Sequence, residues 1–283
     1  MCGFAAGGSL SADEKSPRKE PIMKRSAGSK VSTVRRMLGG LGAAVAAATA
    51  LLGPQASGVA AAAADPSCPD VEVVFARGTF EAPGVGVTGQ AFVDALTARL
   101  GGESGESVDV YPVNYPASLD FGAAANGIAD ASNKIQAIAN TCPNTKIVLG
   151  GYSQGAAVAA YTTTDTIPAG MALPPGITGP MPPEIASHVA AVVLFGKPSN
   201  GILNLVDRNA PPITIGALYT PKTLELCAPG DPICSPGGLS RAAHSAYKDN
   251  GMADQAAAFA ANAITQGSPR AVAPVSPASA HGN

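Results

Sequence analysis

Lys146-Ile147-Val148-Leu149-Gly150-Gly151-Tyr152-Ser153-Gln154-Gly155, followed by the run Ala156 to Ala160, is the stretch that decides the fold. Its apolar first half predicts a buried strand, and the alanine-rich end predicts a helix. Between them stands G-x-S-x-G, which places a serine on a strained turn from strand to helix. Flanking glycines are needed because a Cβ there would clash with the crossing elements. We therefore expect Ser153 to project as a nucleophile, although in a chain with 33 glycines an ordinary tight turn is the alternative.

Further apolar runs rich in β-branched residues alternate with helical patterns. The expected strands are residues 71–76, 108–113, 147–149, 189–195 and 213–219, and the expected helices are residues 90–100, 122–140 and 154–163. A last amphipathic segment, residues 244–264, is expected to close one layer. The alternation predicts a three-layer α/β/α sandwich with a parallel sheet of about five strands. Ligands of such sheets bind outside the carboxyl ends of the strands, so the site is expected at that edge.

The first 64 residues are expected to lie outside the fold. Basic residues precede a long stretch of mainly Ala, Gly, Leu and Val that ends in five alanines. This order is typical of an export signal, here cut just before Asp65. A transmembrane anchor is the alternative, but Gly53-Pro54-Gln55 interrupts the run before the roughly 20 apolar residues that a span needs. Arg35-Arg36 leaves both Sec and twin-arginine export open, and Met23 is a second candidate start.

Removal of this leader leaves 219 residues. Residues 65–266 are enough for one domain with a buried core, whereas the Pro, Ala and Ser tail at 267–283 is expected to be disordered. A net charge of −2 and the lack of a basic run after Arg36 argue against nucleic acid as a partner. We expect a secreted monomer without a membrane span once the signal is removed, and we leave open whether it stays with the cell wall.

The expected domain holds four cysteines, because Cys2 leaves with the leader; they are Cys68, Cys142, Cys227 and Cys234. An even number in an exported chain indicates two disulfides, and four cysteines allow three pairings. A zinc site would need close ligand pairs such as C-x2-C, and the chain has only the looser pair Cys227 and Cys234. No metal and no cofactor are expected.

A serine nucleophile needs a histidine as its base and a carboxylate that orients this histidine. Of the three histidines after the leader, His188 opens the expected fourth strand and His281 lies in the tail, which leaves His244. Asp231 precedes His244 by thirteen residues and gives the order Ser, Asp, His that is typical of α/β-hydrolases.

Other carboxylates compete with Asp231, namely Asp207, Glu225 and Asp249. Asp231 also stands in a Pro-Gly-Asp-Pro sequence that would suit an ordinary turn. A bridge between Cys227 and Cys234 would favour Asp231 as the partner of the histidine. Such a bridge closes a loop of only eight residues, worth about 2.5 kcal/mol, so its better use is to hold Asp231 in one place.

Together these motifs resemble the cutinase family of secreted serine esterases, especially the cutinase-like proteins of mycobacteria and their actinobacterial relatives. The family's G-Y-S-Q-G motif stands at residues 151–155, its C-x3-D-x2-C loop at residues 227–234, and its histidine ten residues later at His244. An A-R-G-[ST]-x-E stretch stands at residues 76–81, and the cysteine eleven residues before the nucleophile is Cys142. The resemblance covers about residues 65–266.

The resemblance implies a lidless, α/β-hydrolase-like fold with disulfides Cys68–Cys142 and Cys227–Cys234. It implies a catalytic triad of Ser153, His244 and Asp231, and an oxyanion hole formed by the backbone N–H groups of Thr79 and Gln154, with the Thr79 hydroxyl a third candidate donor.

The implied function is a secreted carboxylic-ester hydrolase, an esterase or lipase, that acts on short to medium acyl esters of apolar substrates through an acyl-enzyme. Residues 116–121 and 167–183 are expected at the rim, although the second stretch fits a rigid surface connection equally well. The alternatives are an acyltransferase acting on cell-envelope lipids, a noncatalytic surface or antigenic binding module, and a serine peptidase. The natural ester and its chain length are left open.

Overall fold

The computed structural model describes residues 68–266 except 104, 168–172, 174–176 and 209. The predicted leader and tail, and with the tail His281, lie outside the described residues.

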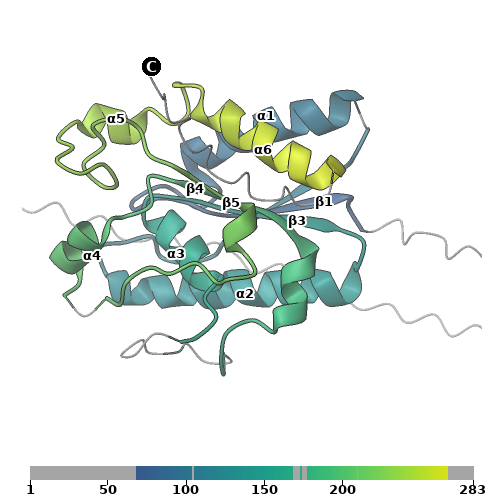
Figure 1. Ribbon diagram of the computed structural model, residues 1–283, viewed down its shortest axis with the longest axis horizontal. Coiled ribbons are helices and arrows are strands. Elements are labelled where there is room, and N and C mark those ends of the chain that lie inside the picture. The colour runs from purple at the N-terminus through teal and green to yellow at the C-terminus, as the bar shows by residue number, and fades with distance from the viewer. Residues whose placement is uncertain (1–67, 104, 168–172, 174–176, 209, 267–283) are drawn as a thin grey trace, which may run out of the picture. The chain divides into compact units, whose positions relative to one another are not determined.

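A five-stranded parallel sheet forms the middle layer (Figure 1). Its strands follow the spatial order β2-β1-β3-β4-β5, and every neighbouring pair is parallel. The strands are β1 (Val71–Ala76), β2 (Val108–Pro112), β3 (Lys146–Tyr152), β4 (Val189–Phe195) and β5 (Thr223–Leu226). The three central strands are buried almost throughout, as expected for parallel strands covered on both faces.

Helices cover both faces of this sheet (Figure 1). α1 (Gly86–Glu103) and α6 (Met252–Gln266) pack on one face, and α2 (Ala124–Thr141) and α3 (Gln154–Thr162) pack on the other. Alternate side chains of β1 enter two separate cores: Val73 and Phe75 join the α1 and α6 side, and Val74 joins the α2 and α3 side. The predicted three-layer α/β/α fold is confirmed.

Shorter helices lie between these elements. They are α4 (Asn200–Val206), α5 (Arg241–Ser245) and the 3₁₀ helices η1 (Phe121–Ala123), η2 (Pro183–His188) and η3 (Thr220–Lys222). Among the described residues, no helix has the length and apolar character that a membrane span requires.

The fifth strand was predicted wrongly at residues 213–219 and lies at Thr223–Leu226 instead. Ile213 and Ile215 pack partly buried against the core on the α2 and α3 side without joining the sheet. A turn then follows, in which Gly216 O accepts hydrogen bonds from the N–H groups of Tyr219 and Thr220. The alternation of apolar residues at 213–219 therefore indicates only that side chains are buried. An extended segment packed beside the sheet buries them as well as a strand within it does.

The predicted single segment at residues 244–264 is in fact two helices. α5 ends at Ser245, and α6 begins only at Met252. Gly251, with φ +84°, lies in the connection between them. The fully buried Tyr247 lies there as well. This break lets α5 remain at the sheet edge while α6 packs against α1.

Candidate active site

Ser153 stands on the turn between β3 and α3 with φ 56° and ψ −117°. A non-glycine residue in such a conformation stores about 1–3 kcal/mol of strain. The flanking glycines make the turn possible. A Cβ on Gly151 would lie 2.1 Å from Gly155 O, and a Cβ on Gly155 would lie 2.0 Å from Ala76 O. The backbone N–H of Ser153 donates to Phe195 O at 2.9 Å, which anchors the turn to β4.

His244 lies on α5 and contacts Ser153 through its ring. Its Nε2 is 2.9 Å from Ser153 Oγ, and its Nδ1 is 2.9 Å from Asp231 Oδ2. Ser240 caps α5 by accepting the N–H of Ala243. From the other side, the Tyr152 hydroxyl donates to His244 O at 2.6 Å. The helix cap and this bond hold the imidazole between the serine and the carboxylate.

Asp231 lies in the loop closed by the Cys227–Cys234 disulfide and is fully buried. Its Oδ1 accepts the backbone N–H of Ile233 at 2.8 Å, and its Oδ2 faces His244. A carboxylate that accepts from Nδ1 fixes the tautomer in which Nε2 is free to accept the serine proton. The structure thus brings the three predicted side chains into one chain of hydrogen bonds.

Tyr247 adds a contact that the sequence reasoning missed. Its hydroxyl donates to Asp231 Oδ2 at 2.5 Å and accepts the N–H of Ala228 at 3.0 Å. Burial and the neighbouring Asp231 raise the pKa of Tyr247, so the phenol stays protonated. The available signal is a lone tyrosine three residues after His244, and its contacts depend on a loop distant in sequence.

Thr79 lies after β1 in a segment whose backbone is held from several sides. The N–H of Gly78 donates to the Glu81 side chain at 2.6 Å, and the N–H of Phe80 donates to Ala117 O at 2.7 Å. Within the part of the chain that the structure describes, the N–H of Thr79 makes no hydrogen bond.

Gln154 begins α3, where the first N–H groups have no partner within the helix. Its side chain donates to Ser118 O at 2.9 Å. Both predicted oxyanion-hole residues border the same cavity as Ser153.

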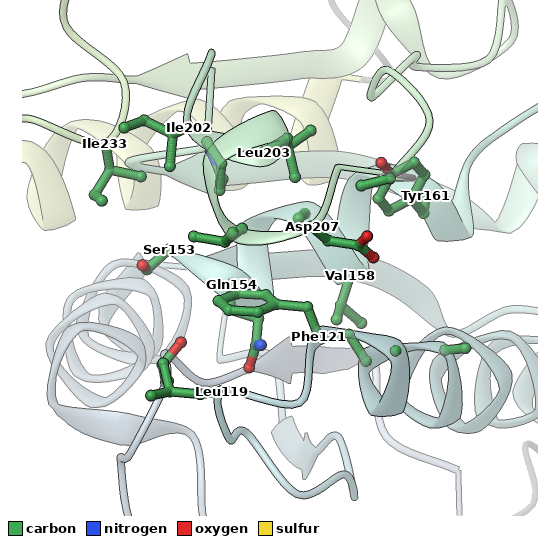
Figure 2. A pocket seen from close by; sticks show the side chains of 18 of the residues that line it. Leu119, Phe121, Ser153, Gln154, Val158, Tyr161, Ile202, Leu203, Asp207 and Ile233 are labelled. Carbon is green, nitrogen blue, oxygen red and sulfur yellow. The ribbon is translucent and has the colours of Figure 1, made fainter. Parts of the chain in front are cut away.

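An apolar cavity of about 580 Å³ opens beside Ser153. Figure 2 shows Ser153 at one side of it and Tyr161 at the other. α4 supplies one wall, which the sequence reasoning missed, with Ile202, Leu203 and Val206. Leu119 and Phe121, from the expected rim at residues 116–121, supply part of the lining.

The second expected rim stretch, residues 167–183, does not line this cavity as far as it is described. Ile167, Leu173, Ile177 and Met181 border a separate small pocket against α2 and α3, and Met171 lies outside the described residues. Met181 also packs against the core on that side. The described residues of this stretch fit its reading as a surface connection, and none of them lines the cavity beside Ser153.

The sequence profile of the cutinase family, described as Cutinase, matches residues 67–264. This chain belongs to the cutinase family. It is 49% identical over 233 residues to "Carboxylesterase Culp1" of Mycobacterium tuberculosis, which covers 82% of this chain and 98% of that one. It is 45% identical over 248 residues to "Phospholipase Culp4" of the same organism. That match covers 88% of this chain and 99% of the relative. The predicted family and the class of serine esterase are thereby confirmed.

Solved structures agree with this assignment. A Trichoderma reesei cutinase in complex with a phosphonate inhibitor is 34% identical, with a TM-score of 0.51 over 70% of this chain and 78% of that one. The catalytic core domain of acetyl xylan esterase from Trichoderma reesei is 24% identical, with a TM-score of 0.53 over 68% and 98%. The second likeness concerns the fold alone.

In this cutinase-family domain, the remaining described candidates do not hydrogen-bond to the His244 ring. His188 is the last residue of η2, directly before β4. Glu225 pairs with Lys197 at 3.3 Å, and Asp249 pairs with Lys248. Asp207 borders the apolar cavity, whereas the carboxylate that meets His244 is that of Asp231. Of the competing carboxylates, none takes the place of Asp231.

The four cysteines form two disulfides. Cys68 is joined to Cys142, and Cys227 is joined to Cys234. Among the described residues, His, Cys, Asp and Glu form no group of three that could hold a metal ion.

Proposed function

We propose that this chain is a secreted hydrolase of short to medium acyl esters that works through an acyl-enzyme on Ser153. The observation that carries the proposal is the chain of hydrogen bonds from Ser153 through His244 to Asp231 at the edge of an apolar cavity. A hydroxyl that hydrogen-bonds to a histidine, itself oriented by a carboxylate, is the arrangement that activates serine for acyl transfer.

In the first half of the reaction, His244 Nε2 takes the proton of Ser153 while Oγ bonds to the ester carbonyl carbon. The carbonyl oxygen becomes an anion in a tetrahedral intermediate. As the intermediate collapses, the bond to the alcohol oxygen breaks and His244 returns its proton to the leaving alcohol. In the second half, water replaces the alcohol in the same steps, and the acid leaves with Ser153 restored.

The backbone N–H groups of Thr79 and Gln154 receive the developing negative charge. Support comes from their position beside Ser153 and from the N–H of Thr79, which makes no other hydrogen bond in the described part of the chain. Loss of one such donor typically lowers turnover by about 10²–10³. The Thr79 hydroxyl is a candidate third donor.

The substrates are apolar esters whose acyl chain enters the cavity beside Ser153. A volume of about 580 Å³ lies within the range of small-molecule sites, and the lining from α4, Leu119 and Phe121 is apolar. A lipid ester is therefore favoured over a charged or polymeric polar substrate.

Export is part of the proposal. The two disulfides support an oxidising compartment, because such bridges are rare in cytosolic proteins. The apolar leader pattern before Asp65 supports removal of residues 1–64 during export. That the mature enzyme is a monomer stays a prediction, to be checked by its elution volume and light scattering.

The first experiment is Ser153→Ala on purified protein with a short-chain nitrophenyl ester. We expect turnover to fall by about 10⁶ while the circular dichroism spectrum and melting temperature are kept. A fluorophosphonate should label the wild type on Ser153 and leave the variant unlabelled. Retained activity in the folded variant would overturn the assignment, and ester products formed with an added alcohol or sugar acceptor would favour an acyltransferase.

A further inference from the structure

Three hydrogen-bond donors converge on the buried carboxylate of Asp231. Oδ1 accepts from the N–H of Ile233 at 2.8 Å, and Oδ2 accepts from His244 Nδ1 at 2.9 Å and from the Tyr247 hydroxyl at 2.5 Å. Charge-assisted hydrogen bonds are the strong ones, and the shortest of these three comes from a residue outside the Ser-His-Asp set. Because Asp231 is fully buried, these donors take the place of water around its charge.

The direction of the tyrosine bond follows from its surroundings. A phenol has one proton to donate, and the Tyr247 oxygen already accepts the N–H of Ala228 at 3.0 Å. Two acceptors compete for that proton, Asp231 Oδ2 at 2.5 Å and the disulfide sulfur of Cys234 at 3.4 Å, and the nearer carboxylate is the stronger acceptor. Packing prevents the ring from turning away: Tyr247 is fully buried and lies edge-on to Phe195 and His244, with ring centroids 6.0 and 6.3 Å apart.

We propose that Tyr247 is a positioning residue of the triad and acts through Asp231. By holding Oδ2 in place, its hydroxyl keeps the carboxylate turned toward Nδ1, so that Nε2 stays directed at Ser153 Oγ. The hydroxyl also joins the two segments that carry the carboxylate and the histidine, since Tyr247 follows His244 by three residues and binds at Ala228 and Asp231. This inference rests on the proposed acyl-enzyme function.

Tyr247→Phe removes the hydroxyl and keeps the ring. We expect kcat for a nitrophenyl butyrate to fall about 10- to 100-fold, the range that corresponds to a buried hydrogen bond to a charged group, with KM within about twofold of the wild type. Activity is measured well below the melting temperature of each variant, so that the fraction folded does not enter the comparison.

A double-mutant cycle separates positioning from general structural damage. If Tyr247 acts through the carboxylate, Tyr247→Phe in an Asp231→Ala background should lower the residual kcat less than twofold. A fall by the same factor in both backgrounds, or a fall of less than threefold in the wild-type background, would overturn the inference. Neither result touches the proposed function, which Ser153→Ala tests separately.

Tyr111→Phe is the matched control. The Tyr111 hydroxyl also donates to a carboxylate, Asp130 Oδ1 at 3.1 Å, but Tyr111 lies on the edge strand β2 and does not border the cavity. Its removal should leave kcat unchanged.

A second measurement does not depend on the folding of any variant. In proton NMR spectra of the wild type, the Tyr247 hydroxyl and the His244 Nδ1 proton should both resonate downfield and show a cross-peak, because both protons point at the same oxygen. A Nδ1 signal without a cross-peak to a tyrosine hydroxyl would overturn the inference.

Discussion

At Gly155 the lack of a side chain allows the chain to cross β1 closely enough to form the serine turn. A Cβ there would lie 2.0 Å from Ala76 O and 2.5 Å from Arg77 O, both backbone atoms that cannot rotate away. The turn that directs Ser153 toward His244 therefore requires a residue without a Cβ atom at position 155.

We predict that Gly155→Ala destabilises the protein by about 3 kcal/mol or more, because the backbone must shift to relieve the overlap. Turnover should fall at the same time, since the shift displaces Ser153 Oγ. Urea unfolding and ester hydrolysis measure the two effects. Gly101→Ala is the control: Gly101 lies in α1 with no heavy atom within 4 Å of an added Cβ, so stability should rise by about 0.5–1 kcal/mol. Equal effects at both positions would contradict the steric argument.

Residues with a local signature could be predicted, and residues defined by tertiary contacts could not. Ser153 could be predicted from the glycines on either side of it, and Asp231 from the cysteines on either side of its loop. Tyr247 has no such mark, because its function depends on a carboxylate sixteen residues earlier in the chain that only folding brings to its hydroxyl.

At the scale of elements, α4 forms a wall of the cavity although it spans only residues Asn200–Val206. Ser199 caps it by accepting the N–H of Ile202. Its side chains divide between two environments, with Leu203 buried and bordering the cavity and Leu205 79% exposed. Seven residues are too few for a clear helical period, which is why the wall was not predicted while the long helices were.

The fifth strand was misplaced for a related reason, since four residues at a sheet edge carry a weaker pattern than the apolar segment before them.

We predict that Ile202→Trp narrows the cavity and shortens the acyl chain that the enzyme accepts. kcat/KM for an octanoate ester should fall about tenfold or more relative to the wild type, whereas the value for an acetate ester should change less than threefold. Leu205→Trp places the same side chain on the exposed face of α4 and should leave the chain-length profile unchanged. A profile that Ile202→Trp leaves unaltered would show that the acyl chain binds elsewhere.

At the scale of the whole molecule, the two disulfides differ in the length of chain that they close and in what that chain carries. Cys68–Cys142 joins the residues before β1 to the end of α2 across 74 positions of sequence, and Cys227–Cys234 spans only seven. In the chain-entropy account the long loop contributes about 4 kcal/mol of stability and the short loop about 2.5 kcal/mol. The short loop, however, carries Asp231.

We therefore predict opposite profiles for two double variants. Replacement of Cys68 and Cys142 by serine should lower the free energy of unfolding by up to about 4 kcal/mol and leave kcat close to the wild-type value. Replacement of Cys227 and Cys234 should cost less stability and lower kcat about tenfold, because the Asp231 loop loosens. Denaturant unfolding with steady-state kinetics measures both. A loss of kcat confined to the first variant would contradict this division.

The positions of the active-site residues along the chain also determine at which stage of protein synthesis the site can form. Ser153 lies near the middle of the described domain, whereas Asp231, His244 and Tyr247 all lie within its last 40 or so residues. Most of the described domain has therefore been translated before His244, the proposed base, is made. Until the loop around Asp231 has folded, Ser153 lacks the histidine and carboxylate that would activate it, so we expect an incomplete chain not to hydrolyse esters.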